Sequence, residues 1–305
     1  MMKITKKEKH FKGVFSPIVT VFDDKMKICP EKIAENIRTY NKTNLTGYMP
    51  LGSNGEFMGL TEDEALEVLK VVVSEASEEK IIVGGCGRES VEKTIHFIKK
   101  VAACGLNYAF ILPPHYFAKQ MTDTALMKFF FSVAEQSPIP IVLYNAPKFA
   151  GGVSISPALA VLLSEHENIV ALKNSSPAPN RDYLQAMQGT DFEIIAGNIG
   201  NFYTGMLEGC DSGVLSTACY LPEFCTRLYD LVKNGQIKEA GALSSKLQTI
   251  STKTAGNLAV PGVKCAMDVR GMNGGSVRLP LMNLTKLEKE HFEAVFEKYE
   301  IGKID

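Results

Sequence analysis

The sequence predicts a closed parallel barrel of the (β/α)8 class, followed by a helical C-terminal extension. Short apolar runs alternate with longer amphipathic runs, and this alternation repeats eight times before the pattern changes. Each apolar run is close to the ~5 residues of a buried parallel strand. An open doubly wound sheet would usually carry a glycine-rich phosphate turn after its first strand, and Thr20-Val21-Phe22-Asp23-Asp24 holds no glycine. The eight strand and helix pairs therefore favour a closed barrel.

The eight strands are expected where the apolar runs lie. In chain order they cover Val14–Phe22, Gly47–Leu51, Ile81–Gly84, Tyr108–Leu112, Ile141–Asn145, Ile169–Lys173, Phe192–Ala196 and Gly213–Ser216. Helices fill the segments between them, and several helix starts carry capping residues. These starts are the capping box Thr61-Glu62-Asp63-Glu64, Ser90, and the pair Ser156-Pro157.

After Ser216 the pattern becomes helical. The expected helices are Glu223–Lys233, Ile237–Thr254, Val263–Val269 and Lys286–Tyr299. A helix would stop at Asn234-Gly235, which marks a break in the pattern. We therefore expect a lead-in over residues 1–12, a catalytic barrel domain over 13–234, and a C-terminal helical region over 235–305.

Composition excludes several classes of protein. The chain has 305 residues, of which 45% are hydrophobic, and a formal net charge of -1. It has no overall basic charge for nucleic acid, and no apolar run approaches the ~20 residues that span a bilayer. We therefore expect neither nucleic acid nor a membrane as a partner. The N-terminal residues lack the apolar core of a signal peptide, so we expect no export.

The cysteines and histidines argue against a metal site. The seven cysteines are odd in number and contain no C-x-x-C pair, which fits reduced thiols in the cytoplasm. The five histidines lie far apart, and none stands near a second type of ligand at a metal-like spacing. A cytoplasmic protein without a bound metal is the expectation.

Two consecutive strands end on reactive side chains. The strand Ile169–Lys173 ends at an amine, and the strand before it ends with the phenol of Tyr144 beside Asn145. A lysine held in a low dielectric loses proton affinity, and its neutral amine can attack a carbonyl to form a Schiff base. A lysine at a strand end is more often solvated or paired with a carboxylate. Because the carboxyl ends of barrel strands build the site, Lys173 and Tyr144 are nevertheless candidate catalytic residues.

Polar residues follow several other strands. Strand two runs into Gly52-Ser53-Asn54-Gly55-Glu56, a turn whose backbone N–H groups and hydroxyl could hold a small carboxylate. Such turns are also common structural punctuation. Strand four is followed by Pro113-Pro114-His115-Tyr116, strand six by Asn174-Ser175, and strand seven by Gly197-Asn198. The sequence thus predicts a carboxylate holder, phenols and an amine at one face of the barrel.

The turn Gly52–Glu56, the motif Tyr144-x-x-Pro147 and Lys173, in that order, resemble the pyruvate-dependent class I aldolases of the dihydrodipicolinate synthase and N-acetylneuraminate lyase superfamily. The resemblance spans nearly the whole chain. It includes the tail segments Pro261–Lys264 and Gly274–Leu281, which are similar to the C-terminal helical region of that family.

The resemblance implies a role for each matching residue. Lys173 would be the Schiff-base lysine, and Tyr144 the phenol that relays protons to and from substrate oxygen. Ser53 would take part in the hydroxyl relay, which Tyr116 would complete from a neighbouring subunit. The backbone N–H groups of Ser53 and Asn54 would bind the pyruvate carboxylate. An iminium at Lys173 withdraws electrons, so the adjacent carbon–carbon bond can break or form through an enamine.

The resemblance also implies how the protein is assembled and what it needs. No metal and no organic cofactor is implied, because the covalent pyruvate Schiff base on Lys173 carries the chemistry. Members of the family are commonly tetramers built from dimers, so we expect a homotetramer.

Two departures from the family pattern narrow the substrate. Dihydrodipicolinate synthases have an arginine two residues beyond the proline of the Tyr-x-x-Pro motif, where this chain has Phe149. Sialic acid lyases have acidic residues after the glycine that follows strand seven, whereas here Gly197 is followed by Asn198-Ile199-Gly200. The first feature argues against a dihydrodipicolinate synthase, and the second argues against a sialic acid lyase.

Three segments are most similar to the 4-hydroxy-2-oxoglutarate aldolase branch, namely residues 52–57, 195–200 and 261–281. This resemblance implies that a short keto acid is cleaved to pyruvate and glyoxylate. In that branch Ser175 and Gly197 would help to bind the substrate, and Lys148 or Asn198 would meet the distal carboxylate.

Other functions stay open. One is dihydrodipicolinate synthase itself, and another is an aldolase or dehydratase for a 2-keto-3-deoxy sugar acid, because Phe149 suggests a partly apolar pocket for the second substrate. A non-catalytic barrel that binds a keto acid is the alternative of another class. Such a binder has no need of a nucleophilic amine, so the presence of Lys173, Tyr144 and Ser53 argues against it.

Overall fold

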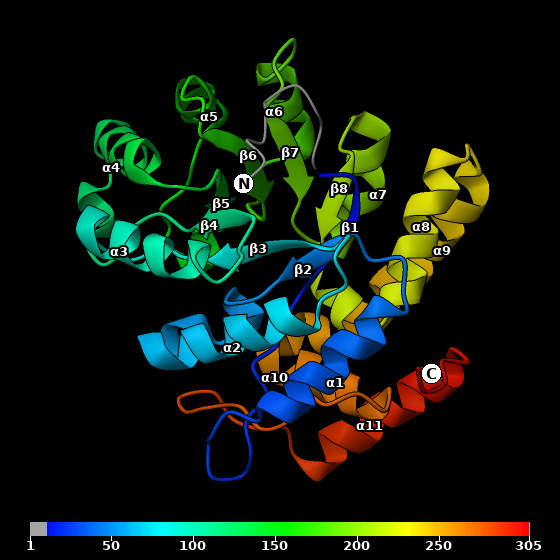
Figure 1. The fold of residues 1–305 in the computed structure, drawn as a ribbon. Helices are drawn as coiled ribbons and strands as arrows, with labels where there is room; N and C mark the ends of the chain where they lie inside the picture. Colours follow the sequence, from blue (N-terminus) through cyan, green and yellow to red (C-terminus); the bar gives the residue numbers. More distant parts are fainter. Residues whose placement is uncertain (1–10, 305) are drawn as a thin grey trace. The chain divides into compact units, whose positions relative to one another are not determined.

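The strands of this protein form a closed parallel barrel. The structure is a computed structural model that describes residues 11–304. Eight parallel strands pair in chain order and close into a barrel, which confirms the predicted (β/α)8 class (Figure 1). The strands are β1 (Gly13–Pro17), β2 (Gly47–Met49), β3 (Ile81–Gly85), β4 (Tyr108–Ile111), β5 (Ile141–Asn145), β6 (Ile169–Asn174), β7 (Glu193–Ala196) and β8 (Ser212–Val214).

The first two strands are shorter than the sequence predicts, and proline explains both differences. We predicted that the first strand runs to Phe22, but β1 ends at Pro17, and Phe22 makes only isolated bridges to Ile28 and Ser276. The second strand was predicted to reach Leu51, but β2 ends at Met49 before Pro50. Proline has no N–H to donate to a strand neighbour, so it ends regular pairing.

The chain groups into two compact units. The first contains the described residues 11–13 and 83–214. In it, α3 (Val91–Ala102) precedes β4, and β4 to β7 are followed in turn by α4 (Asp123–Gln136), α5 (Pro157–Ser164), α6 (Asn180–Ala186) and α7 (Ile199–Glu208) (Figure 1). Every residue of β4 and β5 is buried, which agrees with the continuous apolar runs that predicted them.

The second unit contains residues 14–82 and 215–304. Its helices are α1 (Pro30–Asn41), α2 (Glu62–Glu75), α8 (Pro222–Lys233), α9 (Ile237–Lys253), α10 (Ala255–Val269) and α11 (Lys286–Lys298). In the C-terminal part of this unit, α8 packs on α9, α9 on α10, and α10 on α11. The predicted domain boundaries at residues 12 and 234 stay predictions, and residues 1–10 of the predicted lead-in lie outside the described residues.

The helix α10 begins earlier than predicted. We expected a helix only from Val263, but helical turns begin at Ala255 and are interrupted at Ala259, where φ is 49° and ψ is -134°. Pro261 follows this break. Because proline fits the first turn of a helix but not its interior, it starts the second half of α10 rather than continuing the first.

The predicted caps are confirmed. Thr61 accepts a hydrogen bond from the N–H of Glu64, and the Glu64 carboxylate accepts one from the N–H of Thr61, which completes the capping box of α2. Ser90 and Ser156 cap α3 and α5 in the same way through their hydroxyls. None of the helices within residues 11–304 combines the length and the apolar character needed to span a membrane.

Candidate active site

The structure brings Lys173 and Tyr144 together in the first unit. They are direct partners in the pairing of β6 with β5. The Lys173 amine lies 4.5 Å from the centre of the Tyr144 ring. Both side chains are almost fully buried, with 7% of Lys173 and 6% of Tyr144 exposed. The two residues that we predicted from strand ends therefore form one buried amine and phenol pair.

Phe110 on β4 is a third member of this cluster, which the sequence pattern did not reveal. Its ring stacks on Tyr144 with centroids 4.4 Å apart and planes inclined by 30°. The Lys173 amine lies 5.3 Å from the centre of the Phe110 ring. A phenylalanine within an apolar strand is expected to be a core residue, so only the pairing of the strands shows that it lines the amine. The two rings cover the Lys173 amine, so they keep water away from it and limit the directions from which a substrate can reach it.

Tyr144 and Lys173 are each followed by a buried asparagine, Asn145 and Asn174. Each asparagine ties its strand to the segment beyond it. The Asn145 side chain donates to the carbonyl of Ile155 at 3.1 Å and to the hydroxyl of Tyr183 at 2.8 Å. The Asn174 side chain donates to the Asn180 side-chain oxygen at 3.0 Å. Both asparagines are fully buried. Because these buried amides find partners in the loop before α5 and in α6, the carboxyl ends of β5 and β6 are held in place.

Ser175 and Gly197 also meet in this unit. The Ser175 N–H donates to the carbonyl of Asn145 at 2.8 Å, and its hydroxyl lies 3.4 Å from the carbonyl of Gly197. A Cβ at position 197 would stand 2.1 Å from that hydroxyl and 2.3 Å from the Asn174 carbonyl oxygen. Only glycine fits this close approach of β7 to β6.

Asn198 has a structural role at the start of α7. Its side-chain oxygen accepts a hydrogen bond of 3.0 Å from the N–H of Asn201 and thereby caps the helix. The predicted contact of Asn198 with a distal carboxylate stays a prediction. Lys148 and Phe149, which follow β5, are both exposed.

Tyr116 is exposed in the single chain. The residue is 78% exposed, and its ring packs edge-on against Phe117 with centroids 4.9 Å apart. Its backbone N–H donates to Glu89 at 2.8 Å, and the same carboxylate pairs with the His115 ring at 3.1 Å. The loop after β4 is thus anchored while the phenol remains accessible, and its predicted action on a neighbouring subunit stays a prediction.

The predicted carboxylate-binding turn, Gly52–Glu56, belongs to the second unit. It is a short 3-10 turn over Ser53–Gly55. The N–H groups of Gly55 and Glu56 close it by donating to Gly52 and Ser53 at 3.0 and 3.2 Å. The Asn54 side chain contacts the loop after β8, where its amide nitrogen lies 3.5 Å from the Cys219 sulfur. Successive backbone N–H groups in such a turn can form a concavity that binds a small anion.

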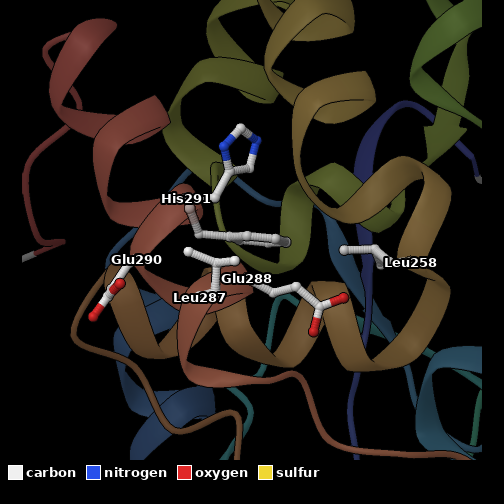
Figure 2. Close-up of a pocket in the computed structure, with 6 residues that line it drawn as sticks. Leu258, Leu287, Glu288, Glu290 and His291 are labelled. Carbon is white, nitrogen blue, oxygen red and sulfur yellow. The ribbon is translucent and has the colours of Figure 1, made fainter.

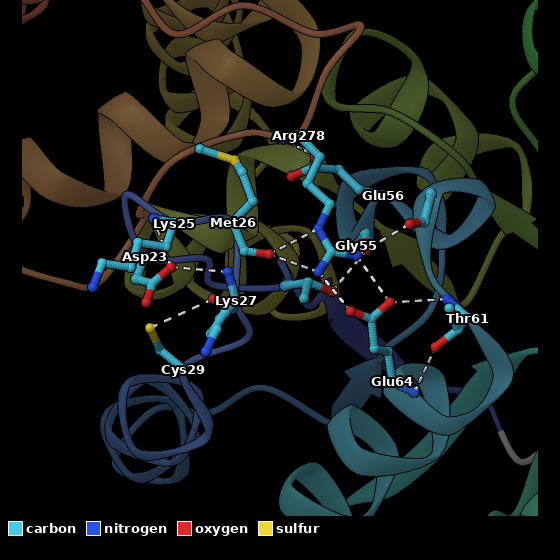
Figure 3. A network of polar contacts seen from close by, with 12 residues as sticks. Asp23, Lys25, Met26, Lys27, Cys29, Gly55, Glu56, Thr61, Glu64 and Arg278 are labelled. Carbon is cyan, nitrogen blue, oxygen red and sulfur yellow. Dashed lines mark hydrogen bonds and ion pairs between the residues drawn. The ribbon is translucent and has the colours of Figure 1, made fainter.

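A polar network fixes the far end of this turn. The Thr20 hydroxyl donates to the Gly55 carbonyl at 2.7 Å, and the Glu56 carboxylate forms an ion pair of 2.5 Å with Lys264. Figure 3 shows Arg278 reaching both the carbonyl of Met26 and the carboxylate of Glu64. The Arg278 hydrogen bond lowers the pKa of Glu64 from 4.5 to about 2. Lys264 belongs to the tail segment Pro261–Lys264, which resembles the family pattern. This tail segment therefore contacts the turn Gly52–Glu56, which resembles the same family.

The structure also contains a pocket that the sequence did not predict. It has a volume of about 520 Å³ and lies between α10 and α11, also in the second unit (Figure 2). Its lining residues are Leu258, Leu287, Glu288, Glu290, His291 and Phe292. None of them is a predicted site residue. Across residues 11–304 no group of three or more His, Cys, Asp or Glu side chains is arranged to hold a metal ion.

Comparisons with known proteins agree with these features. The family model of the dihydrodipicolinate synthetases matches residues 10–299. An L-threo-3-deoxy-hexylosonate aldolase from Aspergillus niger is 30% identical over 319 residues, covering 94% of this chain and 93% of that protein. An Emericella nidulans protein named "Probable 4-hydroxy-2-oxoglutarate aldolase, mitochondrial" is 28% identical over 296 residues, covering 94% of each. A solved dihydrodipicolinate synthase from Bacillus anthracis is similar with a TM-score of 0.87 and 26% identity, covering 94% of this chain and 98% of that one.

Proposed function

We propose that this chain, which belongs to the dihydrodipicolinate synthetase family and is a lyase of the aldolase type, cleaves a short 2-keto acid through a Schiff base on Lys173. The family and the enzyme class predicted from the sequence are confirmed. The observation that carries the proposed chemistry is the buried Lys173 amine, 4.5 Å from the centre of the Tyr144 ring.

The reaction begins with the attack of the unprotonated Lys173 amine on the keto carbon of the substrate. Tyr144 gives its phenol proton to the hydroxyl that leaves as water, and the iminium that forms accepts the electrons of the carbon–carbon bond that breaks. The hydroxyl at the carbon beyond this bond loses its proton to Tyr144 and becomes the aldehyde. The enamine that remains takes up a proton, and water releases pyruvate from Lys173. Tyr144 serves as general base and then returns the proton.

The carboxylate beside the keto carbon would bind to the N–H groups of Ser53 and Asn54. The oxygens of a carboxylate match successive backbone donors at the start of such a turn, which makes the turn suitable for a small anion. The Ser53 hydroxyl would pass protons between Tyr144 and Tyr116. In this proposal Tyr116 comes from a neighbouring copy in a homotetramer, and its high exposure in the single chain supports that placement.

The preferred substrate is 4-hydroxy-2-oxoglutarate, which would give pyruvate and glyoxylate. The similarity to the Emericella nidulans protein over nearly the whole chain supports this choice. Ser175 and Gly197, which meet beside the end of β6, would contact the substrate. Lys148 or Asn198 would meet the second carboxylate, for which the chain has Phe149 in place of the arginine expected in a dihydrodipicolinate synthase.

A 2-keto-3-deoxy sugar acid is the second candidate substrate. The 30% identity with the Aspergillus niger hexylosonate aldolase favours it. The aldehyde released from such a substrate carries hydroxyls rather than a carboxylate, so it needs no arginine where Phe149 stands. The covalent steps at Lys173 would be the same.

An assay of pyruvate release separates these alternatives. Purified protein is given 4-hydroxy-2-oxoglutarate or a 2-keto-3-deoxyhexonate, and pyruvate is followed with lactate dehydrogenase and NADH. In the reverse direction, pyruvate is offered with glyoxylate, glyceraldehyde or aspartate semialdehyde. We expect the first substrate and glyoxylate to be used best, and Lys173→Ala to be inactive with all of them. Preferred use of aspartate semialdehyde would identify a dihydrodipicolinate synthase, and no turnover of any compound would favour a keto-acid-binding protein.

A further inference from the structure

We propose that the buried ion pair of Glu56 and Lys264 is a positioning device for the turn Gly52–Glu56. The pair sets the backbone geometry with which the N–H groups of Ser53 and Asn54 receive the substrate carboxylate. This inference rests on the proposed function, because it assigns a role to residues that would act on the same carboxylate without touching it.

The turn is bounded by two residues in an unusual conformation. Leu51 has a φ of 60° and Glu56 a φ of 52°, and neither residue is glycine. L-residues rarely adopt this left-handed conformation, and it persists only where the surroundings hold it in place. Glu56 follows Ser53–Gly55 directly, so its backbone angles set how the end of the turn is joined to the segment that follows. What holds Glu56 therefore holds the turn.

The Glu56 side chain is held from two sides. One carboxylate oxygen lies 2.5 Å from the Lys264 amine, and the other accepts a hydrogen bond of 2.9 Å from the backbone N–H of Arg278. Only 5% of the Glu56 side chain and 2% of the Lys264 side chain are exposed. With water excluded, the direction and length of these contacts are fixed by the protein alone.

Lys264 is itself immobilised. Its amine donates to the carbonyl of Ser276 at 2.6 Å and lies 4.7 Å from the centre of the Phe22 ring. The segment that provides Ser276 passes very close to α10, because a Cβ on Gly274 would stand 2.0 Å from the Lys264 carbonyl oxygen. The amine thus has one position, defined by α10 and by the tail.

A role in stability alone would not require an ion pair at this place. Well-packed apolar residues usually stabilise a protein as much as a buried ion pair does, because the pair must first be removed from water. What the ion pair adds is a charge-specific contact between α10 and the side chain of one particular residue of the turn, Glu56. Burial lowers the pKa of Lys264, and the neighbouring Glu56 opposes that shift, so the charged form depends on the pair itself.

The experiment compares three variants with the unmodified protein. Lys264→Met breaks the pair, and Lys264→Met/Glu56→Gln removes both charges so that none is buried alone. Arg270→Met is the control, since it breaks another ion pair at the end of α10, between the buried Arg270 and the partly exposed Glu223. For each protein we would measure the melting temperature, the pyruvate concentration that gives half-maximal trapping on Lys173 with borohydride, and the trapping rate at saturating pyruvate.

We expect the pyruvate concentration for half-maximal trapping to rise by about 10-fold or more in Lys264→Met, which is the effect of losing one charge-assisted hydrogen bond. The trapping rate at saturating pyruvate should be nearly unchanged. The control is expected to lose thermal stability without this change. The double variant is expected to melt at a higher temperature than Lys264→Met but to keep its weak pyruvate binding. Normal half-saturation in Lys264→Met, or recovery of binding together with stability in the double variant, would overturn the positioning role. If the unmodified protein is not trapped at Lys173, the proposed function fails and this inference fails with it.

Discussion

Replacing Gly197 with alanine places a methyl group where the end of β6 already stands. The new Cβ would lie 2.3 Å from the Asn174 carbonyl oxygen, whereas ordinary contact begins at 3.4 Å. The backbone next to Lys173 must therefore move by about 1 Å. Overpacking of this kind costs about 1–3 kcal/mol of stability. A shift of about 1 Å in a catalytic group lowers turnover by roughly 10²-fold.

The assay for Gly197→Ala combines turnover with thermal unfolding. Pyruvate release is measured with the best substrate, and the melting curve shows whether the loss comes from unfolded protein. Gly302→Ala is the control, because nothing lies within 4 Å of a Cβ built at that position. We expect the control to keep full activity. Turnover of Gly197→Ala within about 3-fold of the unmodified protein would refute the reasoning, because turnover would then not depend on where the end of β6 lies.

The same site and its polar network support three further predictions. Tyr144→Phe should lower kcat by roughly 10²-fold while leaving borohydride trapping possible, and a change in KM alone would contradict its role in proton transfer. The pKa of Glu64 is lowered to about 2 by Arg278, so its pairing stabilises the fold above pH 4.5, and this contribution is lost as the pH falls toward 2. Urea unfolding of Glu64→Gln should thus show a loss of stability at pH 7 that shrinks by pH 3, and a constant loss would contradict the assignment. Treatment with EDTA should leave turnover unchanged, since no step is assigned to a metal, and inactivation that is reversed by a divalent metal would contradict the Schiff-base mechanism.

The sequence predicts the barrel because its physical signal is repeated. Eight short apolar runs, each followed by an amphipathic one, leave few other arrangements, and the caps at Thr61, Ser90 and Ser156 locate helix starts within the chain. The strand ends near Pro17 and Pro50 were placed less well. An apolar run continues past each proline, so hydrophobicity alone does not show where hydrogen bonding stops.

The core of the site is predictable for a similar reason. Lys173 and Tyr144 stand at corresponding places on neighbouring strands, so the parallel pairing of β5 and β6 brings them together. Phe110 was not predicted, because an aromatic residue inside an apolar strand looks the same whether it lines an amine or fills a core. The contact only emerges once the stagger between strands is known.

The support of the turn Gly52–Glu56 was beyond prediction from local pattern. Glu56 and Lys264 are far apart in the sequence, and no local pattern links them. A glutamate after a glycine-rich turn is expected to be solvated, and a lysine in a helix is expected to be exposed. Only the fold shows that both are buried and that each is the partner of the other.

The central claim is that Lys173 forms an iminium with a keto acid. The most direct test is incubation of the protein with pyruvate and borohydride, followed by peptide mass spectrometry. We expect one reduced pyruvate adduct, on the peptide that contains Lys173. Lys264 is the internal control, because it is even more buried and forms an ion pair with Glu56, and it should stay unmodified. An unmodified Lys173, or an adduct at Lys264 instead, would contradict the claim.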